Sequence, residues 1–154
     1  MKKRIEKLQK NLTHWHADAL YITTPQDLFY LTGLQMSKGV LVVEKKKAHL
    51  IVDGRYFEAC KKNFSGSVHL EEPSTLTKVL KGCNALAFDG DVETVNGFEK
   101  LAKKCGEVIS YIPLSKPVLE IRMVKEKEEI EKIKRACDLC TEGFDYVVER
   151  LRVG

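Results

Sequence analysis

Long hydrophobic runs and a surplus of charge are both missing from this 154-residue sequence. Its longest apolar run covers only residues 40–43, far short of the roughly 20 residues that a membrane-spanning helix needs. Lysine and arginine total 26 against 22 aspartates and glutamates, and the first ten residues alone carry the resulting charge of +4. A nucleic-acid-binding protein would be expected to carry a broader basic surface. The composition therefore predicts neither a membrane nor nucleic acid as a partner.

A disulfide framework, a metal motif and a phosphate-binding loop are also lacking. The five cysteines are odd in number and irregularly spaced, which argues against a secreted scaffold and favours the cytoplasm. The four histidines form no HExxH pattern, and GxxxxGK(S/T), GxGxxG and GxSxG do not occur. Cys137 and Cys140 match CxxC, but they stand alone in the middle of a helical pattern, so we interpret them as apolar-face residues.

Helical and strand-like patterns alternate over the first 113 residues. Apolar residues at steps of three and four predict an opening helix with Ile5, Leu8, Leu12 and Trp15 on one face. Further helices are expected at residues 26–32, 55–64, 73–80 and 95–104, and strands at residues 18–23, 39–43, 48–52, 67–70, 84–88 and 108–112. This alternation predicts an α/β fold with helices on both faces of the sheet, and the hairpin at residues 39–52 makes the sheet mixed.

The pattern changes after the α/β domain, which we place at residues 1–113. Residues 114–125, with a proline directly before them and another inside, are predicted to be a linker. Residues 126–154 are expected to form the first helix leading to a missing domain, with one long helical pattern and a single apolar seam at residues 126–151. The seam consists of Ile130, Ile133, Cys137, Cys140, Phe144, Val147 and Leu151. Either this helix packs back on the sheet, or the partner of its seam is absent from the sequence. The second alternative is favoured, because the predicted domain already has helices for both faces.

Three blocks of the sequence have the order and spacing of a known family. Residues 27–34 (DLFYLTGL) are similar to the segment (N/D)xFYLTGF, and residues 52–56 (VDGRY), followed by Ala59, are similar to DxRY…A. Residues 120–125 (EIRMVK), followed by Glu129, Ile130, Ile133 and Ala136, are similar to ExRxxKxxxEIxxIxxA. The chain therefore resembles, over essentially its whole length, the amino-terminal domain of the creatinase/prolidase/aminopeptidase P family.

The resemblance implies a ribonuclease-H-like mixed α/β domain that precedes a catalytic domain missing from this sequence. In that catalytic domain two Asp, one His and two Glu hold two divalent metal ions (manganese, cobalt or zinc), which serve to hydrolyse the peptide bond before proline. The parent protein would be an Xaa-Pro aminopeptidase or a proline dipeptidase, a homodimer acting on proline-containing peptides. The segment alone is expected to bind no metal or cofactor and to be inactive.

The same resemblance implies roles for named residues. Substrate-access candidates, expected near the mouth of the active site, are Asp27, Tyr30, Leu34, Gln35, Met36 and Ser37. Arg122 and Lys125 are expected to anchor the linker to the neighbouring catalytic domain. The simpler interpretation, from the residues alone, is that Phe29, Tyr30 and Leu31 form helix core.

Two other functions stay open at this point. A non-enzymatic module of the same fold would bind peptides or proteins, as in histone-chaperone relatives of the family. A metal-dependent nuclease would use Asp53, Asp89 and Asp91, which all fall at predicted strand ends. Two of these aspartates precede a glycine, and Asp-Gly pairs are equally common in tight turns, which favours the turn interpretation.

Overall fold

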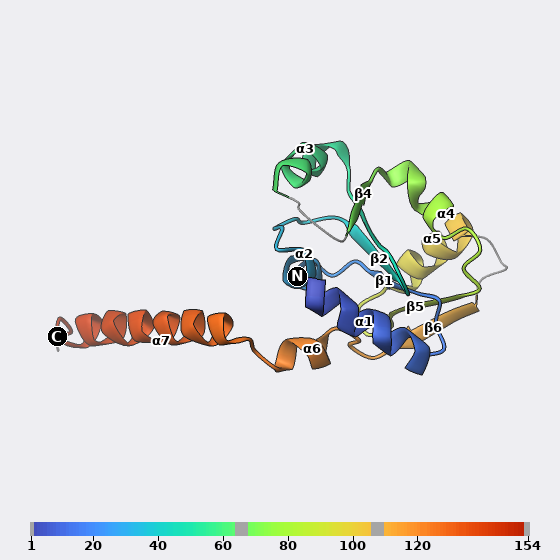
Figure 1. Cartoon of the computed structure of the whole chain (residues 1–154). Helices are drawn as coiled ribbons and strands as arrows, with labels where there is room; N and C mark the ends of the chain where they lie inside the picture. Colours follow the sequence, from blue (N-terminus) through green and yellow to red (C-terminus); the bar gives the residue numbers. More distant parts are fainter. Residues whose placement is uncertain (1, 64–67, 106–109, 153–154) are drawn as a thin grey trace. The chain divides into compact units, whose positions relative to one another are not determined.

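A computed structural model describes residues 2–63, 68–105 and 110–152 of the chain (Figure 1). The chain divides into two compact units, Met1–Ile121 and Arg122–Gly154. The elements are α1 (Lys2–His14), β1 (Ala19–Ile22), α2 (Pro25–Thr32), β2 (Val40–Glu44), β3 (Ala48–Ile51), α3 (Gly54–Asn63), β4 (His69–Glu71), the 3₁₀ turn η1 (Pro73–Thr75), α4 (Leu76–Val79), β5 (Ala85–Asp89), α5 (Val95–Cys105), β6 (Ser110–Leu114), α6 (Leu119–Met123) and α7 (Lys127–Val148).

The strands of the first unit form one mixed sheet, as the sequence predicts. Among the described residues the sheet has six strands in the order β4-β3-β2-β1-β5-β6. Only β2 is antiparallel to its neighbours, with Leu20 of β1 opposite Val43 of β2. The pairs β3–β4, β1–β5 and β5–β6 are parallel. Five strands therefore end at the same edge of the sheet, which we call the carboxyl edge.

Helices cover both faces of this sheet, which confirms the predicted layering. Side chains alternate between the faces along each strand, so Leu20 and Ala87 face one way and Ala19 and Leu86 the other. The first face carries α1, α2, α3 and α6, and the second face carries α4 and α5 (Figure 1). Each face has its own buried apolar cluster, so the sheet lies between two cores.

Helix α1 forms because one stripe of its residues is removed from water. Ile5, Leu8 and Leu12 are buried against the first face of the sheet, and Trp15 packs half-buried beside them. Burial of each such leucine is worth roughly 1.5–3 kcal/mol. The predicted opening helix and its buried face are confirmed.

Helix α2 starts at Pro25, one residue before the predicted start, and ends at Thr32 as predicted, with Gly33 as its C-cap. Proline suits the first helical turn, where its missing N–H would have no partner in the helix. Gly33 has a φ of 72°, and its N–H donates to the carbonyl oxygen of Phe29 at 2.7 Å. This left-handed residue turns the chain out of the helix and into the segment that leads to β2.

Strand β6 extends two residues beyond the predicted end at residue 112. Its Pro113 pairs with Phe88 of β5. Proline lacks an N–H for a further neighbour, and β6 lies at the edge of the sheet, where that N–H is not needed. Three predicted boundaries, at Phe64, Ser67 and Val108, lie outside the described residues.

The segment predicted as a linker contains helix α6. Val118 and Ile121 are buried in the core of the first face. The hydroxyl group of Tyr30 donates to the carbonyl oxygen of Ile121 at 3.0 Å, which joins α2 to α6. Residues up to Ile121 are therefore packed with the first unit.

Helix α7 confirms the predicted long helix, although it stops three residues before the predicted end at Leu151. It begins after Glu126, whose N–H donates to the Glu129 carboxylate at 2.9 Å, and it ends at Val148. All residues of the predicted apolar seam are exposed, with Phe144 at 69% and Leu151, beyond the helix end, at 67%. None of the described helices is both long and apolar enough to span a membrane.

Candidate functional site

The turn after α2 lies at the carboxyl edge of the sheet. This edge also carries Thr23 after β1 and Asp53 after β3. Gly33 redirects the chain, and residues 34–39 then lead into β2, which starts at the same edge. Segments that are distant in the sequence thus meet at one end of the sheet, where α/β proteins commonly place their functional residues.

A shallow hollow of about 400 Å³ lies between α2 and this turn. Its walls are formed by Pro25, Gln26, Phe29, Gln35, Met36 and Ser37. The Phe29 side chain is 54% exposed. The hollow therefore combines an open aromatic ring with the polar groups of Gln35 and Ser37.

The hydroxyl groups of Ser37 and Tyr56 fix one end of the turn. Their oxygens are 2.8 Å apart, and the N–H of Ser37 donates to the same tyrosine oxygen at 3.3 Å. These hydrogen bonds from Ser37 hold the pKa of Tyr56 below its ordinary value. The turn is thereby tied to the first turn of α3.

The structure separates the predicted access residues into two groups. Gln35 and Ser37 are exposed at the hollow, and Met36 lines it although its side chain is only 4% exposed. Asp27 is buried in the first turn of α2, and Leu34 packs half-buried against the core.

Tyr30, another predicted access residue, faces away from the hollow. Besides its bond to Ile121, it accepts a hydrogen bond at its carbonyl oxygen from the Arg4 guanidinium at 2.8 Å. The same guanidinium lies 4.1 Å from the centre of the tyrosine ring. These contacts attach α2 to α1 and α6.

Phe29 is the functional candidate that sequence reasoning missed. Its expected place in the helix core is wrong, because its ring is exposed while Leu31 is buried. The spacing contains the signal: Leu28, Leu31 and Thr32 form the buried i, i+3, i+4 stripe of α2, and Phe29 lies outside it.

The two anchor candidates lie in and after α6. Arg122 belongs to this helix and is half-buried. Lys125 is exposed, and its ammonium group donates to the carbonyl oxygen of Met123 at 3.2 Å. Their role toward a further domain stays a prediction.

The three aspartates of the nuclease alternative have local partners. Asp53 forms an ion pair with Arg55 at 2.7 Å, and this hydrogen-bonded guanidinium lowers the pKa of Asp53. Asp91 accepts a hydrogen bond from the Ser115 hydroxyl at 2.7 Å, and Asp89 accepts one from the N–H of Asp91. The described residues contain no group of three or more His, Cys, Asp or Glu that could hold a metal ion. They therefore do not fit a dinuclear metal centre.

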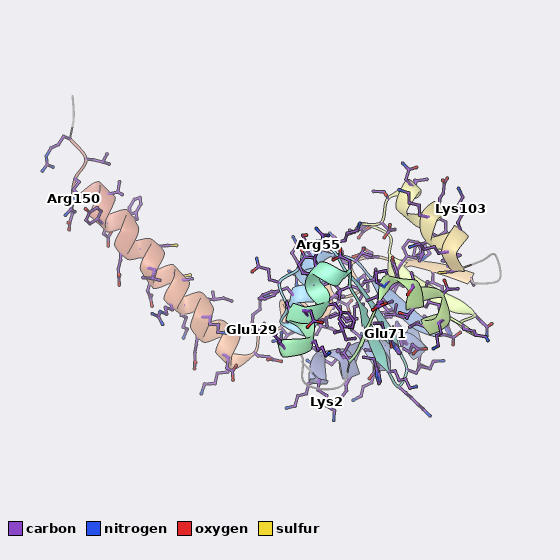
Figure 2. All side chains as sticks on the ribbon, turned by 90° about the horizontal axis from the view of Figure 1, so that it is seen from above. Lys2, Arg55, Glu71, Lys103, Glu129 and Arg150 are labelled. Atoms are coloured by element: carbon purple, nitrogen blue, oxygen red, sulfur yellow. The ribbon has the colours of Figure 1, made fainter. Side chains whose placement is uncertain are left out.

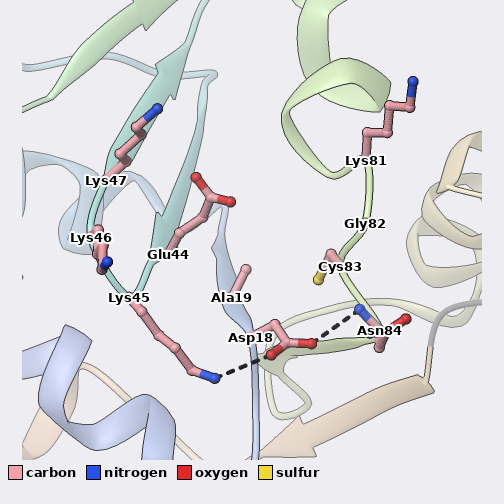
Figure 3. A pocket seen from close by; sticks show the side chains of 10 residues that line it. All are labelled: Asp18, Ala19, Glu44, Lys45, Lys46, Lys47, Lys81, Gly82, Cys83 and Asn84. Atoms are coloured by element: carbon pink, nitrogen blue, oxygen red, sulfur yellow. Dashed lines mark hydrogen bonds and ion pairs between the residues drawn. The ribbon is translucent and has the colours of Figure 1, made fainter.

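A second hollow, of about 410 Å³, lies at the opposite edge of the sheet (Figure 3). Its lining includes Asp18, the hairpin lysines 45–47 and Lys81, and of these lysines Lys45 reaches Asp18. Asp18 accepts hydrogen bonds from the N–H groups of Asn84 and Ala85 and from the Lys45 ammonium. The bond from Asn84, followed by those from Lys45 and Ala85, outweighs partial burial and lowers the pKa of Asp18. These bonds join β1, the hairpin and β5, so the role of Asp18 is structural.

A family profile matches most of the chain. The profile of the creatinase/prolidase N-terminal domain matches residues 4–124. The chain belongs to this family. The predicted fold class and the predicted resemblance are both confirmed.

Relatives of this creatinase/prolidase N-terminal domain are longer proteins named as peptidases. A protein of Mycoplasma pneumoniae with the provisional name Xaa-Pro aminopeptidase is 32% identical over 144 residues, which are 90% of this chain and 39% of that protein. The Xaa-Pro dipeptidase of Pyrococcus furiosus is 25% identical over 158 residues, which are 100% of this chain and 44% of that protein. The chain thus spans less than half the length of these relatives.

Solved structures have the same fold. The Xaa-Pro dipeptidase from Bacillus anthracis matches 99% of this chain with a TM-score of 0.88 and 24% identity, and the match covers 44% of that chain. An isolated N-terminal domain of the cytoplasmic peptidase PepQ from Mycobacterium tuberculosis matches 77% of this chain with a TM-score of 0.69 and 25% identity. In that second case the match covers 97% of the solved chain, so an N-terminal domain of this kind has been crystallised alone.

Proposed function

We propose that this chain is the non-catalytic amino-terminal part of a longer Xaa-Pro peptidase. One observation carries the proposal: the chain matches the N-terminal domain family, yet it spans only 39–44% of relatives named as Xaa-Pro peptidases. The described residues also bring no metal-holding group together. The reaction, hydrolysis of the bond before proline, therefore belongs to the remainder of the longer protein.

In that longer protein the chain has two proposed roles. It pairs subunits in a homodimer, and it limits which peptides reach the active site. The remainder supplies the ligands for two divalent metal ions, manganese, cobalt or zinc. The name of the PepQ relative and the irregular cysteines support a cytoplasmic location.

Restriction of access is assigned to the hollow beside Phe29. The Phe29 ring, with 54% of its surface open, offers an apolar contact surface inside this hollow. Gln35 and Ser37 add hydrogen-bonding groups beside the ring. Together they suit a wall that contacts the part of a peptide beyond the first two residues.

The test compares two single alanine substitutions, each made in the protein that the whole reading frame encodes. Phe29→Ala removes the ring from the hollow, and Val95→Ala removes an apolar group of α5 that is 76% exposed and does not line the hollow. The readout is kcat/KM for an Xaa-Pro dipeptide and for a pentapeptide with the same first two residues. We expect Phe29→Ala to change the pentapeptide-to-dipeptide ratio about threefold or more, as about 0.7 kcal/mol of lost contact would.

Two results would contradict the proposal. If both variants keep the parent ratio, the hollow does not restrict access. If the whole protein cleaves neither peptide with manganese, cobalt or zinc, yet the 154-residue chain forms a stable complex with a proline-containing peptide, the chain is a binding module instead.

A further inference from the structure

The carboxyl edge carries another cavity besides the hollow beside Phe29, which we call the access hollow. This other cavity has charged residues in its lining and lies largely over the second face of the sheet. It has a volume of about 450 Å³, which is within the range of small-molecule pockets. Its floor consists of Tyr21, Val40 and Ile51, three neighbouring positions on the second face. The access hollow shares only Pro25 and Ser37 with it.

The cavity exists because the second face is incompletely covered. Helix α4 has only four residues, so Leu76 and the preceding Pro73 shield one side of these strands. Helix α5 reaches the cavity through Lys104 in its last turn. Tyr21 and Val40 consequently stay half-buried in the middle of the sheet.

The charged groups of the lining favour an anion. Lys38 and Lys104 are both exposed, and neither has a hydrogen bond or ion pair with the residues that the structure describes. The acidic residue of the lining, Asp53, is already paired with Arg55 at 2.7 Å, and Lys38 lies close enough to contribute to the low pKa of that carboxyl group. Lys104 has no such acidic neighbour in the lining. Its positive charge is therefore less offset than that of Lys38.

Two further groups define the remaining polar end. Burial, with the nearby charge of Glu93, raises the pKa of Tyr21 to about 12, so its hydroxyl group keeps its proton near neutral pH. The Thr23 hydroxyl donates to the Glu93 carboxylate at 3.5 Å. Glu93 therefore repels an anion from the Thr23 end, and the anionic group of a ligand is directed toward the lysines.

We propose that this cavity binds a small organic carboxylate with an apolar body. The apolar body packs on Val40, Ile51 and Leu76, and the carboxylate contacts Lys104, with Lys38 as a second cation. Apolar walls with a few charged groups that fix orientation are typical of small-molecule sites. The site does not depend on the peptidase activity of the longer protein.

The test is an NMR titration of the ¹⁵N-labelled 154-residue chain with 4-phenylbutyrate, and with 4-phenylbutan-1-ol as the uncharged probe. With 4-phenylbutyrate we expect saturable shifts at the amides of Tyr21, Val40, Ile51, Leu76 and Lys104. The dissociation constant of the alcohol should be at least about fivefold higher. Resolved amides also distinguish this cavity from the exposed apolar seam of α7, which would give shifts at Ile130 and Phe144 instead.

Neighbouring lysines of α5 supply a matched pair of variants. Lys104→Gln should raise the dissociation constant about fivefold, whereas Lys103→Gln should change it less than twofold. Lys103 is exposed in the same turn, extends outward from α5 (Figure 2) and does not line the cavity. Val40→Phe should fill the cavity and abolish saturation, with a cooperative thermal transition as proof of folding.

Three results would overturn the proposal. The first is an equal effect of the two lysine variants, and the second is equal binding of the acid and the alcohol. The third is the absence of saturable shifts at the cavity amides. If Val40→Phe does not fold, the lysine pair and the two probes still decide.

Discussion

Replacement of Gly33 by alanine tests the conformation of the turn that carries the access hollow. Gly33 has a φ of 72° and a ψ of 3°, in the left-handed region. The left-handed conformation destabilises a residue that has a side chain by about 1–2 kcal/mol. The unfolded chain of the alanine variant has less conformational entropy, and this offsets only part of that loss. We expect a net loss of about 1 kcal/mol, which lowers the midpoint of thermal unfolding by about 2–4 °C in a chain of this size.

Gly54→Ala is the matched control for this substitution. Gly54 begins α3, has no positive φ, and an added methyl group there would have no other atom within 4 Å. We expect this variant to be neutral or slightly more stable, because alanine loses less entropy on folding. Gly33→Asn should fall between the two, since asparagine tolerates the left-handed region. Equal unfolding midpoints for Gly33→Ala and Gly54→Ala in calorimetry would refute the strain at Gly33.

Two further predictions concern pH and thiol reactivity. Hydrogen bonding, first from the N–H of Asn84, lowers the folded-state pKa of Asp18, so its charge stabilises the fold above the unfolded pKa of about 3.9, and this stability is lost as the pH falls through the lower folded value. Urea titrations should therefore show that Asp18→Asn is destabilised at pH 7 and loses less stability than the parent between pH 5 and pH 2; parallel curves would contradict this. Ellman's reagent should label the exposed Cys137 and Cys140 rapidly at pH 8, and Cys83 slowly, because burial and nearby charges, Asp18 first, raise its pKa to about 11. Rapid labelling of Cys83 would exclude the described packing.

The layered fold could be predicted from the sequence because each element carries its own local signal. The α1 stripe, the proline and glycine at the two ends of α2, and the seam of α7 are all visible as spacing. The hairpin at residues 39–52, with lysines 45–47 at its turn, predicted that the sheet would contain an antiparallel pair of strands. Signals of this kind depend on neighbours within about one or two helical turns, and they survive folding unchanged.

Features that depend on distant partners were not predictable. Helix α6 is short and lies between two prolines and a charged segment, and only its contacts with the core of the first face identify it as packed. Pro113 is tolerated in β6 because that strand lies at the edge of the sheet, which the sequence alone does not reveal. Among the access candidates, Asp27 and Tyr30 match the family motif. In the structure Asp27 is buried and Tyr30 donates a hydrogen bond to Ile121, whereas the Phe29 ring is exposed.

The most direct test of the assignment to an Xaa-Pro peptidase uses two proteins, the 154-residue chain and the product of the whole reading frame. Each is incubated with manganese, cobalt or zinc and with an Xaa-Pro dipeptide and an Xaa-Pro pentapeptide, and the released amino-terminal residue is measured. We expect hydrolysis only by the longer protein, and only with metal, because the described part of the chain holds no group of metal ligands. Metal-dependent hydrolysis by the 154 residues alone, or none by the longer protein, would contradict the assignment.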